Sequence, residues 1–260
     1  VTSTPTNIWP VMQIGMILLA ALAVSVLALA PARAESPVVV ELFTSEGCSS
    51  CPPADQYLLD LRERDDVIAL AFHVDYWDYL GWKDRFATHE YTNRQRAYAR
   101  AMGSPMIYTP QLVVDGNAHV VGSDKGSVDD AIAQASARPP MLDIGLIWTE
   151  KRSLTVSIPA ADYDGDATIW FVRYVLDAGS EVTSGENAGK HLVHGNVVDQ
   201  LTAIGMWDGQ AMDITLPWEA IVDNNGEHGF GCAIIVQPEG LGPILGAREI
   251  TYEVTDAATW

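Results

Sequence analysis

The chain has 260 residues, of which 34 are acidic and 15 are lysine or arginine, giving a formal net charge of −19 at pH 7. Such a negative surface is repelled by nucleic-acid phosphates and by anionic lipid headgroups, so we exclude nucleic acid as a partner. Apolar residues make up 48% of the chain, a composition typical of a folded globular protein with one large or two medium domains.

Residues 1–34 have the pattern of a secretory signal peptide. Residues 14–30 are an almost unbroken apolar run, and Ala32-Arg33-Ala34 follows with the small-x-small spacing of a cleavage site. The run is slightly shorter than the roughly 20 apolar residues of a membrane-spanning helix. The absence of a basic residue before the run is atypical, and an uncleaved anchor is the alternative. We expect cleavage before Glu35, a periplasmic or secreted protein, and no membrane association after cleavage.

Strands and helices are expected to alternate between residues 35 and 140. Apolar runs, proline at the start of a helix and turn residues predict the elements. These are strands over 38–43 and 67–74, a helix from 52 that ends before Asp65, a helix over 84–102, a hairpin of strands over 111–115 and 118–121, and a helix from 127 to about 137. The alternation predicts an α/β domain with parallel strands, and Pro139-Pro140 marks its end.

Residues 141–260 predict a second, all-β domain resembling a small antiparallel sandwich. Turn residues separate its strand-like runs, which is the spacing expected of such a sandwich. The runs cover residues 142–149, 154–158, 168–176, 212–216, 230–236 and 244–252. Residues 178–200 are polar and glycine-rich, and we expect them to form a long loop.

The segment Cys48-Ser49-Ser50-Cys51 lies between a predicted strand and the start of a predicted helix. A thiolate there faces unsatisfied N–H groups and the positive end of the helix dipole, which lowers the pKa of the thiol. Cys48 is therefore the predicted nucleophile, and Cys51, one turn into the helix, the resolving cysteine. The alternatives are a structural disulfide and half of a zinc site, although zinc normally takes four ligands. Cys232 is predicted to be a buried strand residue.

Thr109-Pro110 immediately precedes a predicted strand, and its position makes it a candidate for a cis peptide bond. A cis bond at this point would expose backbone beside the cysteines, where an extended substrate could pair. We therefore include both residues among the candidate site residues.

These motifs together resemble the thioredoxin superfamily, and the approach to Cys48 is similar to that of glutaredoxins. The chain after residue 34 resembles a bacterial family of exported thioredoxin-like proteins of unknown function. The matching segments are residues 40–54, 73–77, 108–111, 185–187 and 194–198. The resemblance implies a thioredoxin-like α/β domain and a cysteine pair, but no settled activity. The Ser-Ser dipeptide replaces the Gly-Pro of thioredoxin, which leaves the direction of electron flow open.

Four further residues are candidates on weaker grounds. Glu41, a carboxylate in an apolar strand, could accept the proton of Cys51 or be solvated at the sheet edge. His73, at the end of the second strand, could tune the thiolate, join a metal or be a core histidine. His191 and His194 form an H-x-x-H pair near carboxylates, which is a weak pattern for a metal. We predict no cofactor and no metal beyond these weak candidates.

Three functional hypotheses follow, in order of preference. The first is an envelope thiol–disulfide oxidoreductase whose partners are protein or small-molecule thiols and disulfides. The second is a copper- or metal-handling binding protein, because soft thiolates beside His73 select Cu(I). The third is a structural or interaction protein with an inert disulfide, in which residues 141–260 contact a partner or a carbohydrate.

Overall fold

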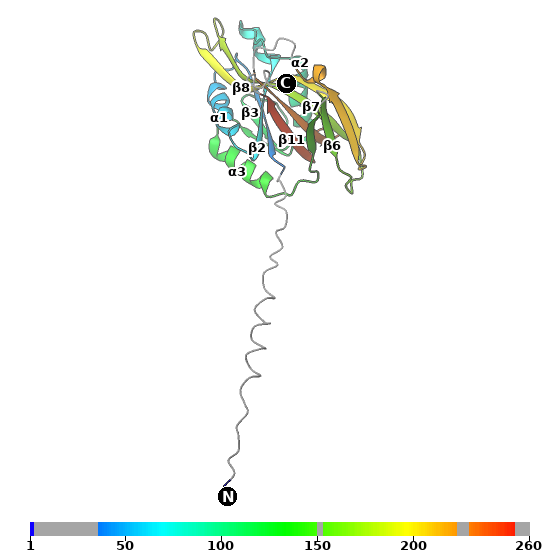
Figure 1. Cartoon of the computed structure of the whole chain (residues 1–260). Helices are drawn as coiled ribbons and strands as arrows, with labels where there is room; N and C mark the ends of the chain where they lie inside the picture. The colour runs from blue at the N-terminus through cyan, green and yellow to red at the C-terminus, as the bar shows by residue number, and fades with distance from the viewer. Residues whose placement is uncertain (3–35, 150–152, 223–228, 253–260) are drawn as a thin grey trace. The chain divides into compact units, whose positions relative to one another are not determined.

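The computed structural model describes residues 1–2, 36–149, 153–222 and 229–252 (Figure 1). Contacts between Cα atoms set Val1–Ala34 apart from one compact unit, Glu35–Trp260. From residue 3 onward, the predicted signal peptide and its cleavage site lie outside the described residues. No helix within the described ranges combines the length and the hydropathy needed to cross a membrane.

The first half of the compact unit alternates strands and helices in the predicted order. Its elements are β1 (Val38–Thr44), α1 (Pro52–Leu61), β2 (Val67–His73), the short 3₁₀ helix η1 (Asp75–Leu80), α2 (His89–Ala101), β3 (Gln111–Val114), β4 (Ala118–Val121) and α3 (Lys125–Ser136). β1 pairs in parallel with β2 and antiparallel with β3, and β3 pairs antiparallel with β4. The Thr109–Pro110 peptide bond is cis, which confirms that prediction.

The second half is formed by long antiparallel strands and one short helix. Its elements are β5 (Gly145–Thr149), β6 (Ser153–Ile158), β7 (Ala167–Glu181), β8 (His191–Trp207), β9 (Met212–Pro217), α4 (Trp218–Ile221), β10 (Phe230–Pro238) and β11 (Gly246–Tyr252). The described strands form an eight-stranded mixed sheet in the order β11-β10-β7-β8-β2-β1-β3-β4 and a three-stranded sheet in the order β5-β6-β9.

The predicted fold class, an α/β thioredoxin-like domain followed by an all-β sandwich-like domain, is wrong. The described residues are mostly β, and one mixed sheet contains strands from both sides of residue 140. The error arose in residues 178–200, because residues 178–181 end β7 and residues 191–200 begin β8, so that only residues 182–190 form a loop. Polar His194 and Asn196 occupy buried positions of β8, so the hydropathy pattern did not indicate a strand.

The two halves of the sheet meet where β8 lies beside β2. Ala71 of β2 is the parallel partner of Val197 of β8. Asn196 reinforces this junction by donating a hydrogen bond from Nδ2 to the carbonyl oxygen of Ala69, at 2.9 Å. The pairing between these two strands is short, and the side-chain amide supplies a hydrogen bond where a regular strand pair would have backbone hydrogen bonds.

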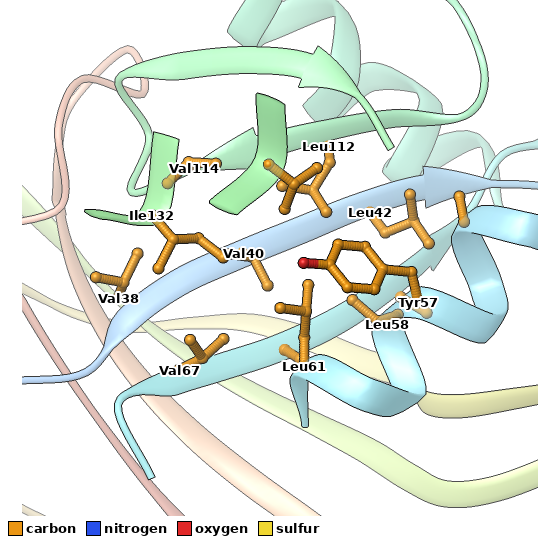
Figure 2. Close-up of a cluster of buried hydrophobic side chains, with 14 of the residues drawn as sticks. Val38, Val40, Leu42, Tyr57, Leu58, Leu61, Val67, Leu112, Val114 and Ile132 are labelled. Atoms are coloured by element: carbon orange, nitrogen blue, oxygen red, sulfur yellow. The ribbon is translucent and has the colours of Figure 1, made fainter. Parts of the chain in front are cut away.

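Alternation along β1 divides the core between the two faces of the sheet. The even-numbered side chains Val38, Val40 and Leu42 join a cluster with residues of α1 and α3 (Figure 2). The odd-numbered Val39 and Phe43 join a second cluster that includes residues of α2. A third cluster fills the space between the three-stranded sheet and strands β7 and β10.

Gly231 of β10 gives a direct test of packing in the large sheet. A Cβ atom at Gly231 would lie 2.2 Å from Cζ of the buried Tyr174 ring. We expect Gly231→Ala to lower the free energy of unfolding by about 1–3 kcal/mol, because a packed interior resists added volume. Urea denaturation measures the effect. The control is Gly126→Ala in α3, where the new Cβ would be 3.7 Å from its nearest neighbour, Asp124 Oδ1. A loss for Gly231→Ala no larger than for Gly126→Ala would refute the packing argument.

Candidate functional site

The two cysteines at the start of α1 form a disulfide. Cys48 and Cys51 are bonded to each other, and each residue is 0% exposed. Ser49 and Ser50, between them, are exposed. Cys51 is the N-cap residue of α1, and Pro52 occupies its first turn. The sulfur atoms therefore lie beneath an exposed two-residue turn at the positive end of a helix.

Five ionisable side chains are buried close to this disulfide, and we call them the buried ionisable cluster. They come from the loop after β1, from α1, from the end of β2, from the segment after η1 and from β8. Parallel pairing brings the ends of β1 and β2 to one edge of the sheet, where reactive groups commonly gather. The members are Glu46, Asp55, His73, Asp84 and His194, none more than 4% exposed.

His73 and Asp84 form the tightest pair in the cluster. His73 Nδ1 lies 2.7 Å from Asp84 Oδ2, which also accepts a hydrogen bond from the backbone N–H of Glu46. Burial lowers the pKa of His73, but the charge and hydrogen bond of Asp84 outweigh it, so the pKa lies above its usual value. Burial raises the pKa of Asp84, but His73 and two backbone N–H groups hold it below the usual range. The contact thus favours the protonated form of His73 and the ionised form of Asp84.

His194 lies between the two remaining carboxylates of the cluster. Its Nε2 is 3.7 Å from Glu46 Oε1 and its Nδ1 is 3.7 Å from Asp55 Oδ2. Its ring centroid lies 4.7 Å from that of His73, edge to face. Among the residues that the structure describes, no hydrogen-bond partner is present for either ring nitrogen of His194, for Nε2 of His73 or for one oxygen each of Glu46 and Asp55. The cluster thus retains unused hydrogen-bonding capacity.

The two carboxylates flanking His194 have opposite pKa shifts. Burial raises the pKa of Asp55, whose Oδ1 accepts a 2.7 Å hydrogen bond from Thr44 Oγ1. Burial also raises the pKa of Glu46, but His194 and the indole N–H of Trp82 outweigh this effect and the pKa lies below its usual value. Asp55 is therefore the carboxyl group of the cluster that holds a proton most readily.

The segment between β7 and β8, residues 182–190, lies against the disulfide segment, and we call it the cover loop. Asn187 Nδ2 donates hydrogen bonds to the carbonyl oxygens of Glu46 and Cys48, each at 2.9 Å. Glu186 Oε2 accepts from the backbone N–H of Ser49 at 3.3 Å. The second half of the chain therefore contacts the residues on both sides of Cys48.

Glu41, the predicted proton acceptor for Cys51, is engaged elsewhere. Its carboxylate oxygens lie 2.6 and 2.9 Å from the guanidinium nitrogens of Arg94, and Tyr98 also donates to it. Because Glu41 is an odd-numbered residue of β1, it lies on the α2 face, whereas α1 covers the opposite face. The structure does not bring Glu41 to the cysteine pair, and Asp55 lies on the cysteine side instead.

Thr109 and Pro110 are linked to the disulfide segment through Trp77. The indole N–H of Trp77 donates to Thr109 Oγ1 at 2.8 Å. A Cβ atom on Gly47, next to Cys48, would lie 3.0 Å from Trp77 Cβ, so Trp77 packs on this turn. Trp77 therefore connects Thr109 with the residue that precedes Cys48.

The weak metal candidates separate into two groups. His73 and His194 lie together in the buried ionisable cluster, whereas His191 is exposed and pairs with Glu181 at 2.8 Å. Among the residues that the structure describes, no group of three or more His, Cys, Asp or Glu side chains is arranged to hold a metal ion.

Sequence reasoning missed four residues of the site: Glu46, Asp55, Asp84 and Asn187. Each is a common polar residue whose role depends on partners that are distant in the sequence. One indication was available, because residues 185–187 and 194–198 carried part of the family resemblance, although only His194 among them was given a role, as a weak metal candidate. Those segments contain Asn187 and His194, which the fold places at the disulfide.

The fold and site define a mostly β protein with a buried disulfide at a helix start and a buried ionisable cluster beside it. The chain belongs to the family described as "Protein of unknown function (DUF1223)", whose model matches residues 39–237. It is similar to a protein from Agrobacterium tumefaciens with a known crystal structure, at 31% identity and a TM-score of 0.70, over 83% of this chain and 95% of that chain.

A second solved structure shares the fold alone. HBP35 of Porphyromonas gingivalis matches with a TM-score of 0.57 at 12% identity, over 84% of this chain and 75% of that chain. No curated protein matches the sequence. The comparisons therefore give a family and a fold without an activity.

Proposed function

We propose that the protein carries out thiol–disulfide exchange at Cys48 and Cys51. The observation that carries this proposal is a disulfide at the N-terminus of α1 with a buried ionisable cluster beside it. Helix N-termini stabilise thiolates, which are both the nucleophiles and the leaving groups of the exchange. The partners are protein or small-molecule thiols and disulfides.

In the reducing direction, a thiolate of a partner dithiol attacks Cys48 Sγ. The Cys48–Cys51 bond breaks, a mixed disulfide forms on Cys48, and Cys51 leaves as a thiolate. The second thiol of the partner then attacks the partner's other sulfur, which is bonded to Cys48 in the mixed disulfide, and Cys48 is released. The partner loses two electrons and two protons and becomes a disulfide, while the cysteine pair gains both. The oxidising direction is the reverse.

The buried ionisable cluster supports the proton part of this exchange. A thiolate released in a buried site beside carboxylates is costly unless it is protonated or paired. Asp55 lies one helical turn after Cys51, and its N–H donates to the Cys51 carbonyl oxygen at 3.1 Å. Burial favours the protonated form of Asp55. Asp55 thus gives its proton to the Cys51 thiolate in the reducing direction and accepts it again in the oxidising direction, the role that sequence reasoning assigned to Glu41.

The proposed exchange belongs in an oxidising compartment, in the periplasm or outside the cell. Disulfides persist there, whereas cytosolic thiols are kept reduced. The Cys48–Cys51 bond and the signal-peptide pattern of residues 14–34 support this location.

The test is a redox titration of the compact unit, residues 35–260, in buffers of set potential, with thiols counted by alkylation and mass. We expect a midpoint between about −120 and −270 mV, the range of exchanging oxidoreductases. A midpoint below about −300 mV would identify a structural disulfide and overturn the proposal.

Two variants control this titration. Cys232→Ser is expected to leave the midpoint unchanged, because burial raises the pKa of the Cys232 thiol to about 12 and keeps it unreactive. Cys48→Ser is expected to abolish reduction of insulin disulfides. Wild-type activity in that variant would place the reaction elsewhere in the chain.

A further inference from the structure

We propose that the cover loop, residues 182–190, must move away from Cys48 before a thiol can reach the disulfide, and that Asn187 is the positioning residue that holds it closed. This inference rests on the exchange proposed above and adds the control of access to it.

The sulfur atoms of the disulfide are not accessible from the solvent in this structure. An attacking thiolate must approach a sulfur of the disulfide directly. Cys48 and Cys51 are both 0% exposed, although the serines between them are exposed. Exchange therefore requires some segment over the cysteines to open.

Asn187 attaches the cover loop to the disulfide segment. Its side-chain amide donates to two carbonyl oxygens that flank Gly47, those of Glu46 and Cys48. Its Oδ1 accepts a hydrogen bond from Lys190 Nζ at 2.8 Å, and the residue is 0% exposed. The hydrogen-bonding capacity of the amide group is thus largely used at the disulfide segment, so Asn187 fastens the cover loop at Cys48 itself.

Apart from Val182, which is buried, and Gly185, which packs against Trp82, the remaining attachments of the cover loop are polar. Ser184 Oγ donates to the carbonyl oxygen of Gly81 at 2.5 Å, and Glu186 accepts from Ser49. No residue of the cover loop belongs to the three hydrophobic clusters. Segments with little buried apolar contact open at lower free energy than the core, so the cover loop can leave without unfolding the sheet.

The test measures the rate at which tris(2-carboxyethyl)phosphine reduces the Cys48–Cys51 disulfide in residues 35–260, followed by alkylation and mass. We expect Asn187→Ala to increase this rate about tenfold, because two buried hydrogen bonds that hold the loop closed are lost. Asn187→Asp, which keeps the shape but loses the donor group, is expected to behave similarly. Asn117→Ala, at an exposed turn, is the matched control and should leave the rate unchanged.

A second control separates opening of the cover loop from general destabilisation. Gly231→Ala weakens the large sheet without touching the cover loop and should leave the reduction rate unchanged. Below the unfolding transition, the Asn187→Ala rate should depend only weakly on urea, as expected of local opening. A folded Asn187→Ala protein with a rate within twofold of wild type would overturn the inference. An equal increase in Gly231→Ala would do so as well, because it would indicate global unfolding.

If Asn187→Ala does not fold, the double variant Ser184→Ala/Glu186→Ala gives the test with milder changes. We expect a rate increase of about threefold, and an unchanged rate would overturn the inference. The phosphine reduces any disulfide that it can reach, so these rates do not depend on the midpoint potential. The midpoint potential therefore tests the exchange function, and the reduction rates test the role of the cover loop, so either proposal can be overturned without the other.

Discussion

Replacing Arg94 with methionine is expected to lower the free energy of unfolding by about 3–5 kcal/mol. The side chains of Arg94 and Glu41 are 3% and 1% exposed, and their closest atoms are 2.6 Å apart. Arg94 also donates to Gln237 of β10, so one guanidinium joins α2 to strands from both halves of the chain. Methionine leaves the Glu41 carboxylate buried without its counter-charge, and that uncompensated charge is the main cost. Urea denaturation at pH 7 measures the loss.

Two further variants identify the cause of that loss. Arg64→Met removes a pair with Asp66 in which the two side chains are 37% and 54% exposed, and should cost less than about 1 kcal/mol. Adding Glu41→Gln to Arg94→Met should recover a large part of the loss, because the buried charge disappears. If Arg94→Met cost no more than Arg64→Met, the buried pair would not be a main support of the fold.

Replacing Asp84 with asparagine is expected to lower the free energy of unfolding by about 3 kcal/mol near pH 6. The Asp84 carboxylate is 1% exposed and accepts hydrogen bonds from His73 and from the backbone N–H groups of Glu46 and Phe86. Asparagine removes the charge that stabilises the imidazolium of His73. Urea denaturation as a function of pH measures the effect.

The contribution of the His73–Asp84 pair to the free energy of unfolding changes with pH in a defined direction. The pKa of His73 is raised above 6.5, so its contribution is full below 6.5 and is lost as the pH rises through the folded-state value. The pKa of Asp84 is lowered below 3.8, so its contribution is full above 3.8 and is lost as the pH falls through the folded-state value. The pair therefore stabilises the fold most between pH 3.8 and 6.5.

Asp84→Asn should reduce both of these pH-dependent changes in stability. The control is Asp60→Asn, whose pair with Lys125 is 57% exposed on both sides and should change stability by less than about 1 kcal/mol. A wild-type pH profile in Asp84→Asn would show that the His73–Asp84 pair does not set the pH response.

Local sequence was sufficient to predict the first elements. Residues 38–43 and 67–74 were expected as buried strands, and β1 and β2 occupy nearly those ranges. The helix expected from residue 84 begins only at His89, because Thr88 caps it by accepting from the N–H of Tyr91. Asp84 is not free to start that helix, since its carboxylate is bonded within the buried ionisable cluster.

The large sheet could not be predicted in the same way. Its continuity depends on β8, whose buried positions include His194 and Asn196. These polar side chains are stable there because they meet partners from β2 and from the start of α1, which are more than a hundred residues away in the sequence. A hydropathy pattern does not contain such pairings, and so residues 178–200 were predicted as a loop.

The candidate site was predictable to the extent that spacing reveals chemistry. Cys48 and Cys51 form a local pattern, as does Thr109-Pro110, and the structure joins the two cysteines in a disulfide and links Thr109 to their turn through Trp77. Asp55 and Asp84 belong to no such pattern, because Asp84 reaches the N–H of Glu46 across 38 residues. Glu41 was the reasonable choice for a buried acid, but the pleat of β1 directs it to the face of Arg94.

The distance along the chain between Cys48 and Asn187 determines the order in which the parts of the site are synthesised. Asn187 follows Cys48 by 139 residues, so at roughly 5–20 residues per second the ribosome makes it on the order of ten seconds later. The two cysteines therefore leave the ribosome long before residues 182–190 exist. The hydrogen bonds from Asn187 to the carbonyl oxygens of Glu46 and Cys48 are therefore absent throughout that interval and form only after residues 182–190 have been made.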